Sequence, residues 1–312
     1  MPTTLVPRRI GGRTFDFARR TAVMAVVNRT PDSFYDAGST YALDAAVAKA
    51  TEAVRAGADW VDIGGVPFSP DTPEVSPEEE LSRVLPVVEA LAADSDVVIS
   101  VDTYTPEVAT ACLAAGASVI NDVTGLRNPD LAEVIADSEA TVVIAHSLAE
   151  PHRHLRRPQY QDVVTEIRDF LLRRVDVALS AGIPPERIVI DPGHDLNKNT
   201  MHSLEITRRL GELTGLGYPV LVALSNKDFI GETLDRPRSQ RLSGTLATTA
   251  LCIAAGARIV RAHNVPETID AVRMTEAVLG LRQPAWLRHN IDDDALALTT
   301  VGAEGPGEGT QQ

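Results

Sequence analysis

The sequence contains little cysteine and few aromatic residues. Its 312 residues include two cysteines, and 4% are Phe, Trp or Tyr. Two thiols are too few for a disulfide framework or a cysteine metal cluster, and they fit a reducing compartment. No apolar run approaches the length of a membrane span. We therefore predict a cytoplasmic protein that does not associate with membranes.

Positive charge is also scarce. The chain has 29 Lys and Arg against 43 Asp and Glu, which gives a net charge of −14. Nucleic-acid binding requires clustered cations, so we expect no nucleic-acid partner. A small anionic ligand remains compatible with this charge, because one site needs only a few local cations.

Apolar runs alternate with segments of helical spacing over most of the chain. The runs are rich in Val, Ile and Ala and show little alternation, which is typical of parallel strands covered on both faces. The predicted strands are 22–28, 60–65, 97–103, 118–123, 140–147, 188–193, 219–225 and 258–264. Eight such units in roughly 250 residues predict an α/β fold, a (β/α)8 TIM barrel forming a single domain. A doubly wound open sheet is the alternative, but no glycine-rich dinucleotide loop follows the first strand.

Helix boundaries are marked by caps. Ser76, Thr105 and Asn128 each precede a proline, as expected for an N-cap followed by proline at the first helical position. The repeated Ala-Gly-Ala links at Gly57, Gly116 and Gly256 place glycine where a helix ends in a left-handed residue.

The barrel accounts for most but not all of the chain. We assign residues 21–282 to it, and residues 1–20 to an amino-terminal extension in which GGRTFDF forms a short hairpin at the barrel bottom. Residues 283–312 form a tail. Its last part, VGAEGPGEGTQQ, lacks apolar periodicity, so we expect the tail to be partly disordered.

Polar residues stand at or near the ends of the predicted strands. Barrel enzymes build their active sites from the carboxyl ends of successive strands, so we expect these side chains to converge. They are Asn28, Asp62, Asp102, Asn121, His146, Asp191, Lys227, Arg261 and His263.

Four of these residues suit a flat heterocycle. An ionised carboxylate in an apolar setting requires donors, and Asp102 and Asp191 each match the two parallel N–H groups of a 2-amino-pyrimidinone edge. Asn121 offers both a donor and an acceptor, and Lys227 can donate to a ring atom. Alternatively, each residue caps a neighbouring loop.

A second group suits phosphate. Arg261 and His263 lie two apart, so they project in the same direction at the end of the last strand. The loop after strand eight is a recurrent phosphate site in barrels, and Asn28 is adjacent once the barrel closes. We therefore expect a pyrophosphate site, with a surface salt bridge of Arg261 as the alternative.

Three polar loops remain. Residues 29–38 and 67–74 contain Pro and Gly and are expected to cover the site. Residues 152–157 form a basic run, which we interpret as a solvated helix lead-in rather than an anion site. His152 and His154 are weak evidence for a metal site.

The chain resembles dihydropteroate synthase, a folate-pathway barrel enzyme, from about residue 14 to residue 280. The resemblance rests on motifs in a fixed order: NRTPDSFYDAG, GADWVDIGG, SVDTYTPEVA, GASVINDVTG, DPG, SNKDFIG and RAHNV. Enzymes of that family join 6-hydroxymethyl-7,8-dihydropterin pyrophosphate to p-aminobenzoate and release pyrophosphate. The resemblance implies a homodimer as well.

The resemblance also implies roles for individual residues. Asp102, Asn121, Asp191 and Lys227 would bind the pterin, and Asn28, Arg261 and His263 would bind the pyrophosphate. Mg2+ is the implied cofactor, with Asn28 as its ligand. Lys227 and Arg261 would be catalytic, because they stabilise charge on the departing pyrophosphate.

The chain departs from the family pattern in several places. Where the family has Glu-Ser-Thr-Arg-Pro-Gly after the Gly pair, residues 66–71 read VPFSPD. Ser-Arg-Lys-Ser is replaced by SNKD at 225–228, and Ile-Gly-Phe-Gly-Lys by HDLNK at 194–198. His-Met-Arg-Gly is replaced by HSLA at 146–149, and the Asp after the last-strand His by Asn264.

These changes fall on the parts of the family pattern that face the arylamine or form mobile loops. We therefore predict a diverged paralogue that binds a pterin pyrophosphate or a related small anion and has weak or no standard coupling activity. Alternatives are an ordinary active synthase, a non-catalytic pterin- or anion-binding barrel, and a folate-dependent methyltransferase. The last is disfavoured because Lys227, Arg261 and His263 suit a pyrophosphate ester.

Overall fold

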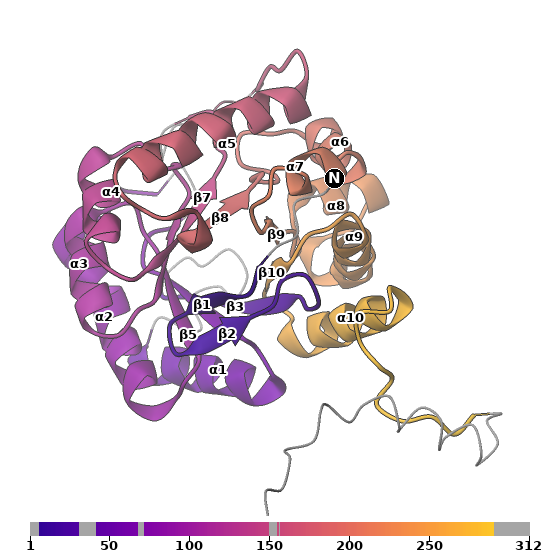
Figure 1. Cartoon of the computed structure of the whole chain (residues 1–312), viewed down its shortest axis with the longest axis horizontal. Coiled ribbons are helices and arrows are strands. Elements are labelled where there is room, and N and C mark those ends of the chain that lie inside the picture. Colours follow the sequence, from indigo (N-terminus) through magenta and orange to yellow (C-terminus); the bar gives the residue numbers. More distant parts are fainter. Residues whose placement is uncertain (1–5, 31–41, 68–71, 150–154, 156, 290–312) are drawn as a thin grey trace, which may run out of the picture.

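The chain folds into a barrel of parallel strands surrounded by helices (Figure 1). The computed structural model describes residues 6–30, 42–67, 72–149, 155 and 157–289. Eight strands form one sheet in the order β8, β7, β6, β5, β4, β3, β10, β9. A parallel bridge between Ile190 and Val220 links the two outer strands. The sheet therefore closes, which confirms the (β/α)8 barrel and rules out the open sheet.

The barrel strands lie within the ranges that the apolar runs predict, although most are shorter. They are β3 (Ala22–Asn28), β4 (Trp60–Gly64), β5 (Val98–Asp102), β6 (Val119–Asp122), β7 (Thr141–Ala145), β8 (Ile188–Asp191), β9 (Leu221–Ala223) and β10 (Ile259–Ala262).

Helices follow the strands and cover their outer faces. They are α1 (Leu43–Ala56), α2 (Pro77–Asp94), α3 (Pro106–Ala114), α4 (Pro129–Ala136), α5 (Val163–Ser180), α6 (Thr200–Arg208), α7 (Gly211–Thr214), α8 (Asp228–Leu234), α9 (Leu242–Ala254) and α10 (Val265–Val278). Two 3-10 turns, Pro185–Arg187 and Arg238–Gln240, complete the connections. No helix in the described part of the chain combines the length and apolarity that a membrane span requires.

Most of the predicted helix caps are confirmed. Ser76 and Asn128 accept hydrogen bonds from the backbone N–H groups of Glu79 and Asp130. Thr105 occupies the N-cap position as predicted, but its side chain makes no capping bond; its hydroxyl donates to Glu80 Oε2 at 2.9 Å. Gly57, which ends α1, has a φ of 107°, in the left-handed region where a side chain is disfavoured.

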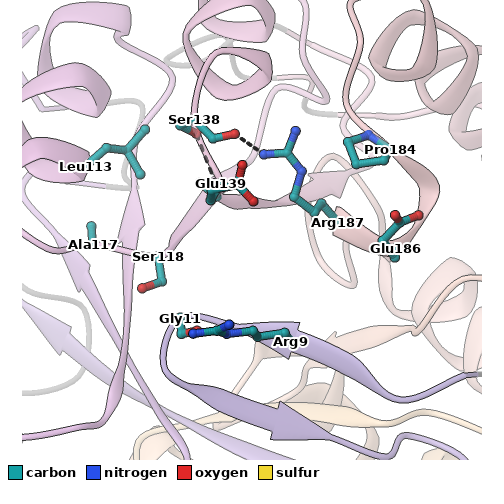
Figure 2. Close-up of a pocket in the computed structure, with 11 residues that line it drawn as sticks. Arg9, Gly11, Leu113, Ala117, Ser118, Ser138, Glu139, Pro184, Glu186 and Arg187 are labelled. Carbon is teal, nitrogen blue, oxygen red and sulfur yellow. Dashed lines mark hydrogen bonds between the residues drawn. The ribbon is translucent and has the colours of Figure 1, made fainter.

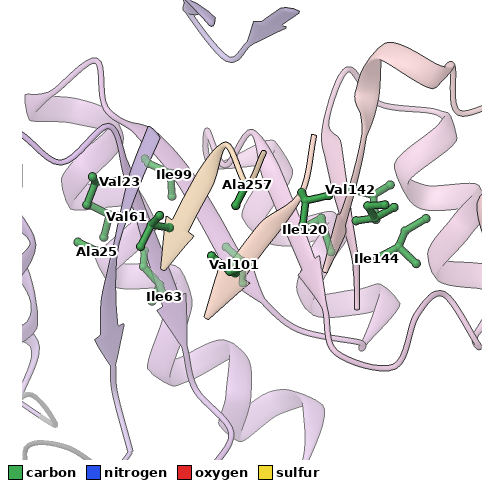
Figure 3. Packing of buried hydrophobic residues seen from close by; sticks show 14 of the residues in the cluster. Val23, Ala25, Val61, Ile63, Ile99, Val101, Ile120, Val142, Ile144 and Ala257 are labelled. Carbon is green, nitrogen blue, oxygen red and sulfur yellow. The ribbon is translucent and has the colours of Figure 1, made fainter. Parts of the chain in front are cut away.

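Two apolar layers result from the alternation of side chains along each strand. Val23, Ala25 and Val61 belong to the larger layer, which packs between the barrel and its helices (Figure 3). The intervening residues, such as Met24 and Trp60, form a smaller cluster inside the barrel. This inner cluster fills the barrel near the amino-terminal ends of the strands.

A short hairpin lies against the inner cluster. β1 (Arg8–Ile10) pairs antiparallel with β2 (Arg13–Phe15), so the hairpin starts three residues before GGRTFDF. Phe15 meets the Trp60 ring edge-on, with 5.8 Å between centroids. Nη1 of Arg8 donates to the carbonyl of Ile188 at 2.8 Å. The hairpin therefore occludes this end, and a site must lie at the carboxyl ends of the strands.

A hollow of about 620 Å³ lies at the occluded end, between the hairpin and three helix-to-strand links. Figure 2 shows Arg9 of the hairpin facing Ser118, Glu139 and Glu186 across it. Arg187 also lines it, but its guanidinium donates to the carbonyl of Ser138. The hollow is separate from the polar strand ends described next.

Candidate functional site

A row of polar residues crosses four neighbouring strands at the open end of the barrel. In the sheet register, Asn28 pairs with Gly64, Gly64 with Asp102, and Asp102 with Asn121. A Cβ atom on Gly64 would lie 3.4 Å from Asn28 Oδ1 and 3.7 Å from Asp102 Cβ. The glycine therefore leaves space between an amide and a carboxylate that the register brings together.

Asp62 lies one layer deeper and is completely buried. It accepts hydrogen bonds from Ser100 Oγ at 2.6 Å, Asn121 Nδ2 at 3.1 Å and Arg261 Nε at 2.6 Å. Asp62 was predicted to lie among the strand-end residues, but no role was predicted for it. Its location inside an apolar strand was the available signal, since a buried carboxylate requires several donors.

Arg261 spans the site from β10. Besides its bond to Asp62, Nη2 lies 3.1 Å from Asp102 Oδ2. Burial favours the neutral form of Arg261, but the carboxylates of Asp62 and Asp102 outweigh it and raise the pKa of the guanidinium. The arginine is thus in an ion pair, as the alternative interpretation held, but this pair lies inside the barrel mouth rather than on the surface.

The carboxyl of Asp102 has a pKa near neutral pH. Burial raises the pKa of its carboxyl to about 7, Arg261 opposes the shift, and the nearby Asp62 adds to it. The side chain is still 25% exposed, so it can contact a ligand. A carboxyl with this pKa can be protonated in the free protein and ionise when a ligand supplies donors.

Asp191 and Lys227 lie on the opposite side of the mouth. Asp191 Oδ1 accepts from the backbone N–H of Gly193 at 2.7 Å. Burial raises the pKa of Asp191, while that hydrogen bond and the charges of Lys227, Lys198 and Arg261 lower it. Burial lowers the pKa of Lys227, and Asp195 and Asp191 oppose that shift. These mutual influences place Asp191, Lys227 and Arg261 in one electrostatic cluster.

His263 follows Arg261 by two residues and is half-buried. Its backbone N–H donates to Ser225 Oγ at 3.2 Å, which ties the end of β10 to the end of β9. Asn28, also half-buried, ends β3 beside β10. The predicted site residues therefore all lie at the same end of the barrel.

Several residues that depart from the family pattern contact one another after β9. Asn226 has a φ of 57°, and its Nδ2 donates to Asn264 Oδ1 at 3.0 Å. Nη1 of Arg241 donates to Asp228 Oδ1 at 2.7 Å and to the carbonyl of Asn226 at 2.9 Å. The guanidinium lies over Gly231, where a Cβ would clash with it. The added carboxylate of Asp228 is therefore matched by a cation.

The loop after β8 is held on two sides. Asn197 Nδ2 donates to Ser147 Oγ at 3.0 Å, and Asn197 O accepts from Tyr160 Oη at 3.1 Å. Lys198 Nζ lies 2.9 Å from His146 Nδ1 and donates to Leu196 O at 2.9 Å. Burial and Lys198 lower the pKa of His146 to about 2, so its imidazole is neutral.

Some predicted features lie wholly or partly outside the described residues. They include most of the covering loop at 29–38, residues 68–71 of the second loop, residues 150–154 and 156 around the basic run, and residues 290–312 of the tail. Within the described residues, no group of three or more His, Cys, Asp or Glu is arranged to hold a metal ion.

Comparison with known proteins identifies the class to which this fold and site belong. The family model described as pterin binding enzyme matches residues 24–263. The chain therefore belongs to the family of pterin-binding enzymes.

Within that family it is a diverged homologue of dihydropteroate synthase. A protein of Mycobacterium leprae named inactive dihydropteroate synthase 2 is 43% identical over 273 residues, covering 86% of this chain and 94% of that protein. The dihydropteroate synthase of Yersinia pestis, solved with a sulfonamide drug complex, superposes with a TM-score of 0.84 at 37% identity, over 88% of this chain and all of that one.

A third relative has been solved with a bound ligand. Dihydropteroate synthase from Xanthomonas albilineans, in complex with 7,8-dihydropteroate, superposes with a TM-score of 0.79 at 40% identity. The match covers 88% of this chain and 99% of that one. The predicted family and the predicted divergence within it are thus confirmed.

Proposed function

We propose that this chain binds a pterin pyrophosphate and couples it to p-aminobenzoate weakly or not at all. The observation that carries the proposal is the contrast between two parts of the site. The polar row and its buried partner Asp62 are intact, whereas the changed residues after β8 and β9 bond to one another or to loop backbone. The relative named as inactive supports the same conclusion.

The proposed pterin contacts are Asp102, Asn121, Asp191 and Lys227. The carboxylates would accept the ring N–H groups, the amide would read a neighbouring donor and acceptor, and the ammonium would donate to a ring atom. Because Arg261 bonds Asp102, the ring must either displace Arg261 from that carboxylate or stack on its guanidinium.

The proposed pyrophosphate contacts are Asn28, Arg261 and His263, where the barrel closes between β10 and β3. Lys227 and Arg261 would be the catalytic residues, because each carries the positive charge that stabilises a departing pyrophosphate. An amine that attacks the pterin methylene would complete a coupling reaction, and no covalent nucleophile is required.

Mg2+ fits this proposal as a partner of the pyrophosphate. It prefers oxygen ligands and often combines few protein ligands with phosphate oxygens and water. Asn28 Oδ1 lies beside Gly64 in the polar row and would be such a ligand. It would hold the ion together with the phosphates, and the ion would neutralise charge on the leaving group.

We further propose a cytoplasmic homodimer. Leu251 of α9, and Met274 and Val278 of α10, are 63%, 65% and 73% exposed. Their helices pack side by side, so a second copy that covered them would remove apolar surface from water.

Retained catalysis is the second candidate function. It is favoured by the Xanthomonas relative, which is 40% identical to this chain and was solved in complex with 7,8-dihydropteroate. The proposed roles of Lys227 and Arg261 serve both candidates, so a measurement of turnover must decide.

The test is a titration of the purified protein with the pterin pyrophosphate and Mg2+, with and without p-aminobenzoate. Calorimetry would measure binding, and a coupled assay would measure pyrophosphate release. We expect binding with little release. Ordinary p-aminobenzoate-dependent release would support the active synthase instead, and no binding would refute both.

A further inference from the structure

We propose that Asp195, in the loop after β8, is a positioning residue for Lys227. The inference rests on the proposed function only in taking Lys227 as a ligand contact. Asp195 stands where the family pattern has glycine, and it keeps a φ of 63°. Its carboxylate accepts from the two backbone N–H groups that follow Lys227, and the preceding carbonyl, of His194, accepts from the Lys227 amine.

The first contact is with the backbone that follows Lys227. Lys227 is the N-cap residue of α8, and its side chain makes no capping bond. Asp195 Oδ2 accepts instead from the N–H of Asp228 at 2.7 Å and from that of Phe229 at 3.4 Å. Asp195 thus caps α8 from another segment and fixes where the main chain of Lys227 lies.

The second contact is with the side chain. Lys227 Nζ donates to the carbonyl of His194, the neighbour of Asp195. The His194 ring is fully buried, lies 3.2 Å from Thr207 Oγ1 through Nε2, and stacks on Phe229. The two loop residues therefore hold Lys227 at its backbone and at its amine.

The loop itself is anchored from α6. Ser203 Oγ donates to Asp195 Oδ1 at 2.9 Å, and the N–H of Asp195 donates back to Ser203 Oγ at 3.2 Å. Both carboxylate oxygens of Asp195 therefore accept hydrogen bonds, Oδ1 from a residue of α6 and Oδ2 from residues of α8. A glycine at this position would tolerate the backbone conformation but would supply neither bond.

The charge of Asp195 acts on Lys227 as well. The charged groups that act on Lys227 are Asp195, Asp191, Arg261 and Asp228, and Lys198 interacts with it as well. Asp228 is already paired with Arg241. Burial lowers the pKa of the Lys227 amine, and Asp195 is the foremost of the charges that oppose this shift.

Two variants separate the cap from the charge. Asp195→Asn keeps an acceptor for the Asp228 N–H and removes the charge, whereas Asp195→Gly removes both. Asp235→Asn is the matched control, because Asp235 ends the same helix, is exposed and has a φ of 52°.

The first measurement needs no ligand. Amide hydrogen exchange at Asp228 and Phe229 should be about fivefold faster or more in Asp195→Gly, the factor expected from a lost helix cap. It should change less in Asp195→Asn and not at all in Asp235→Asn. Unchanged exchange in Asp195→Gly would overturn the capping role even if the protein bound no pterin.

The second measurement is pterin affinity against pH. In Asp195→Asn the loss of affinity at alkaline pH should begin at a lower pH than in the parent, because the Lys227 amine deprotonates earlier. The control should follow the parent. An Asp195→Asn profile that coincides with the parent would overturn the electrostatic role, whereas absence of pterin binding in the parent would refute the proposed function alone.

Discussion

Arg261 Nε lies 2.6 Å from Oδ2 of the fully buried Asp62. The pair joins β10 to β4 across the interior of the barrel, and Asp62 also accepts from Ser100 and Asn121. A buried carboxylate with three donors holds the open end of the barrel in one arrangement, so its removal has consequences for both stability and binding.

Asp62→Ala should destabilise the protein by about 3–5 kcal/mol, the usual effect of removing one partner of a buried ion pair. Arg261 and Asn121 would keep unpaired donors in a buried setting. Urea unfolding would measure the change. Asp228→Ala is the matched control, since it also removes the partner of an arginine; Asp228 is 66% exposed, so the change should stay below about 1 kcal/mol. Equal effects in the two variants would contradict the central role of Asp62.

Asp102→Ala should weaken pterin binding by roughly tenfold to a hundredfold, because each unpaired ring donor costs about 1–3 kcal/mol. Calorimetry with the pterin pyrophosphate would measure this. Asp122→Ala is a poor control because Asp122 is buried and accepts from Thr124 and Leu126. Glu107→Ala, in the first turn of α3, is a better one. Unchanged affinity in Asp102→Ala would remove Asp102 from the pterin site.

Pterin affinity should rise with pH up to about 7 and then level off. Burial raises the pKa of Asp102 to about 7. Below that value the carboxyl is protonated and must lose its proton to accept ring N–H groups, so affinity should fall by up to tenfold for each pH unit. Calorimetry between pH 5.5 and 8 would test this, and Asp102→Asn should show a flatter profile.

The raised pKa of Asp102 has the opposite effect on the stability of the free protein, which it lowers as pH rises. An acid with a raised pKa binds its proton more tightly when folded than when unfolded. The contribution of Asp102 therefore decreases as pH rises from about 4 to about 7. In urea unfolding over that range, Asp102→Asn should lose less stability than the parent. An identical pH dependence in the two proteins would contradict the assigned pKa.

The double substitution Asn226→Arg with Asp228→Ser restores the family pattern and should raise residual coupling to p-aminobenzoate. The gain is limited by strain, because position 226 has a φ of 57°, which Asn tolerates, whereas this conformation costs most other side chains about 1 kcal/mol or more. Loss of the Asp228 carboxylate also leaves Arg241 bonded to backbone carbonyls alone. Pyrophosphate release would be measured, with Asp228→Ser alone as control. No gain over that control would weaken the argument that these positions set the activity.

The strands and most caps were predictable because their signals are local. A run such as AVMAVVN indicates a buried parallel strand wherever it occurs, and Ser76 before Pro77 is a helix start on its own. Thr105 is the N-cap residue as predicted, but its hydroxyl bonds Glu80 on another helix rather than a backbone N–H of α3. Local patterns carry no information about such a competitor.

The residues of the site were predictable from the sequence, but the hydrogen bonds and ion pairs among them were not. Periodicity placed Asp102 and Asn121 at strand ends, and barrel topology brought them to one end of the fold. It did not reveal that Asp62 binds Asn121 and Arg261, because that depends on how far a long side chain reaches across the interior. Nor did it pair Asp228 with Arg241, which lies thirteen residues further on.

The sequence alone determined the barrel, its strand order and the residues that face its open end, because hydrophobic period and chain connectivity leave few other arrangements. The tertiary structure decided which charges are neutralised, which carboxyl is held near neutrality and which loop holds Lys227. Those outcomes depend on distances between segments far apart in the chain and on the exclusion of water around them, and neither is encoded in the spacing of residues.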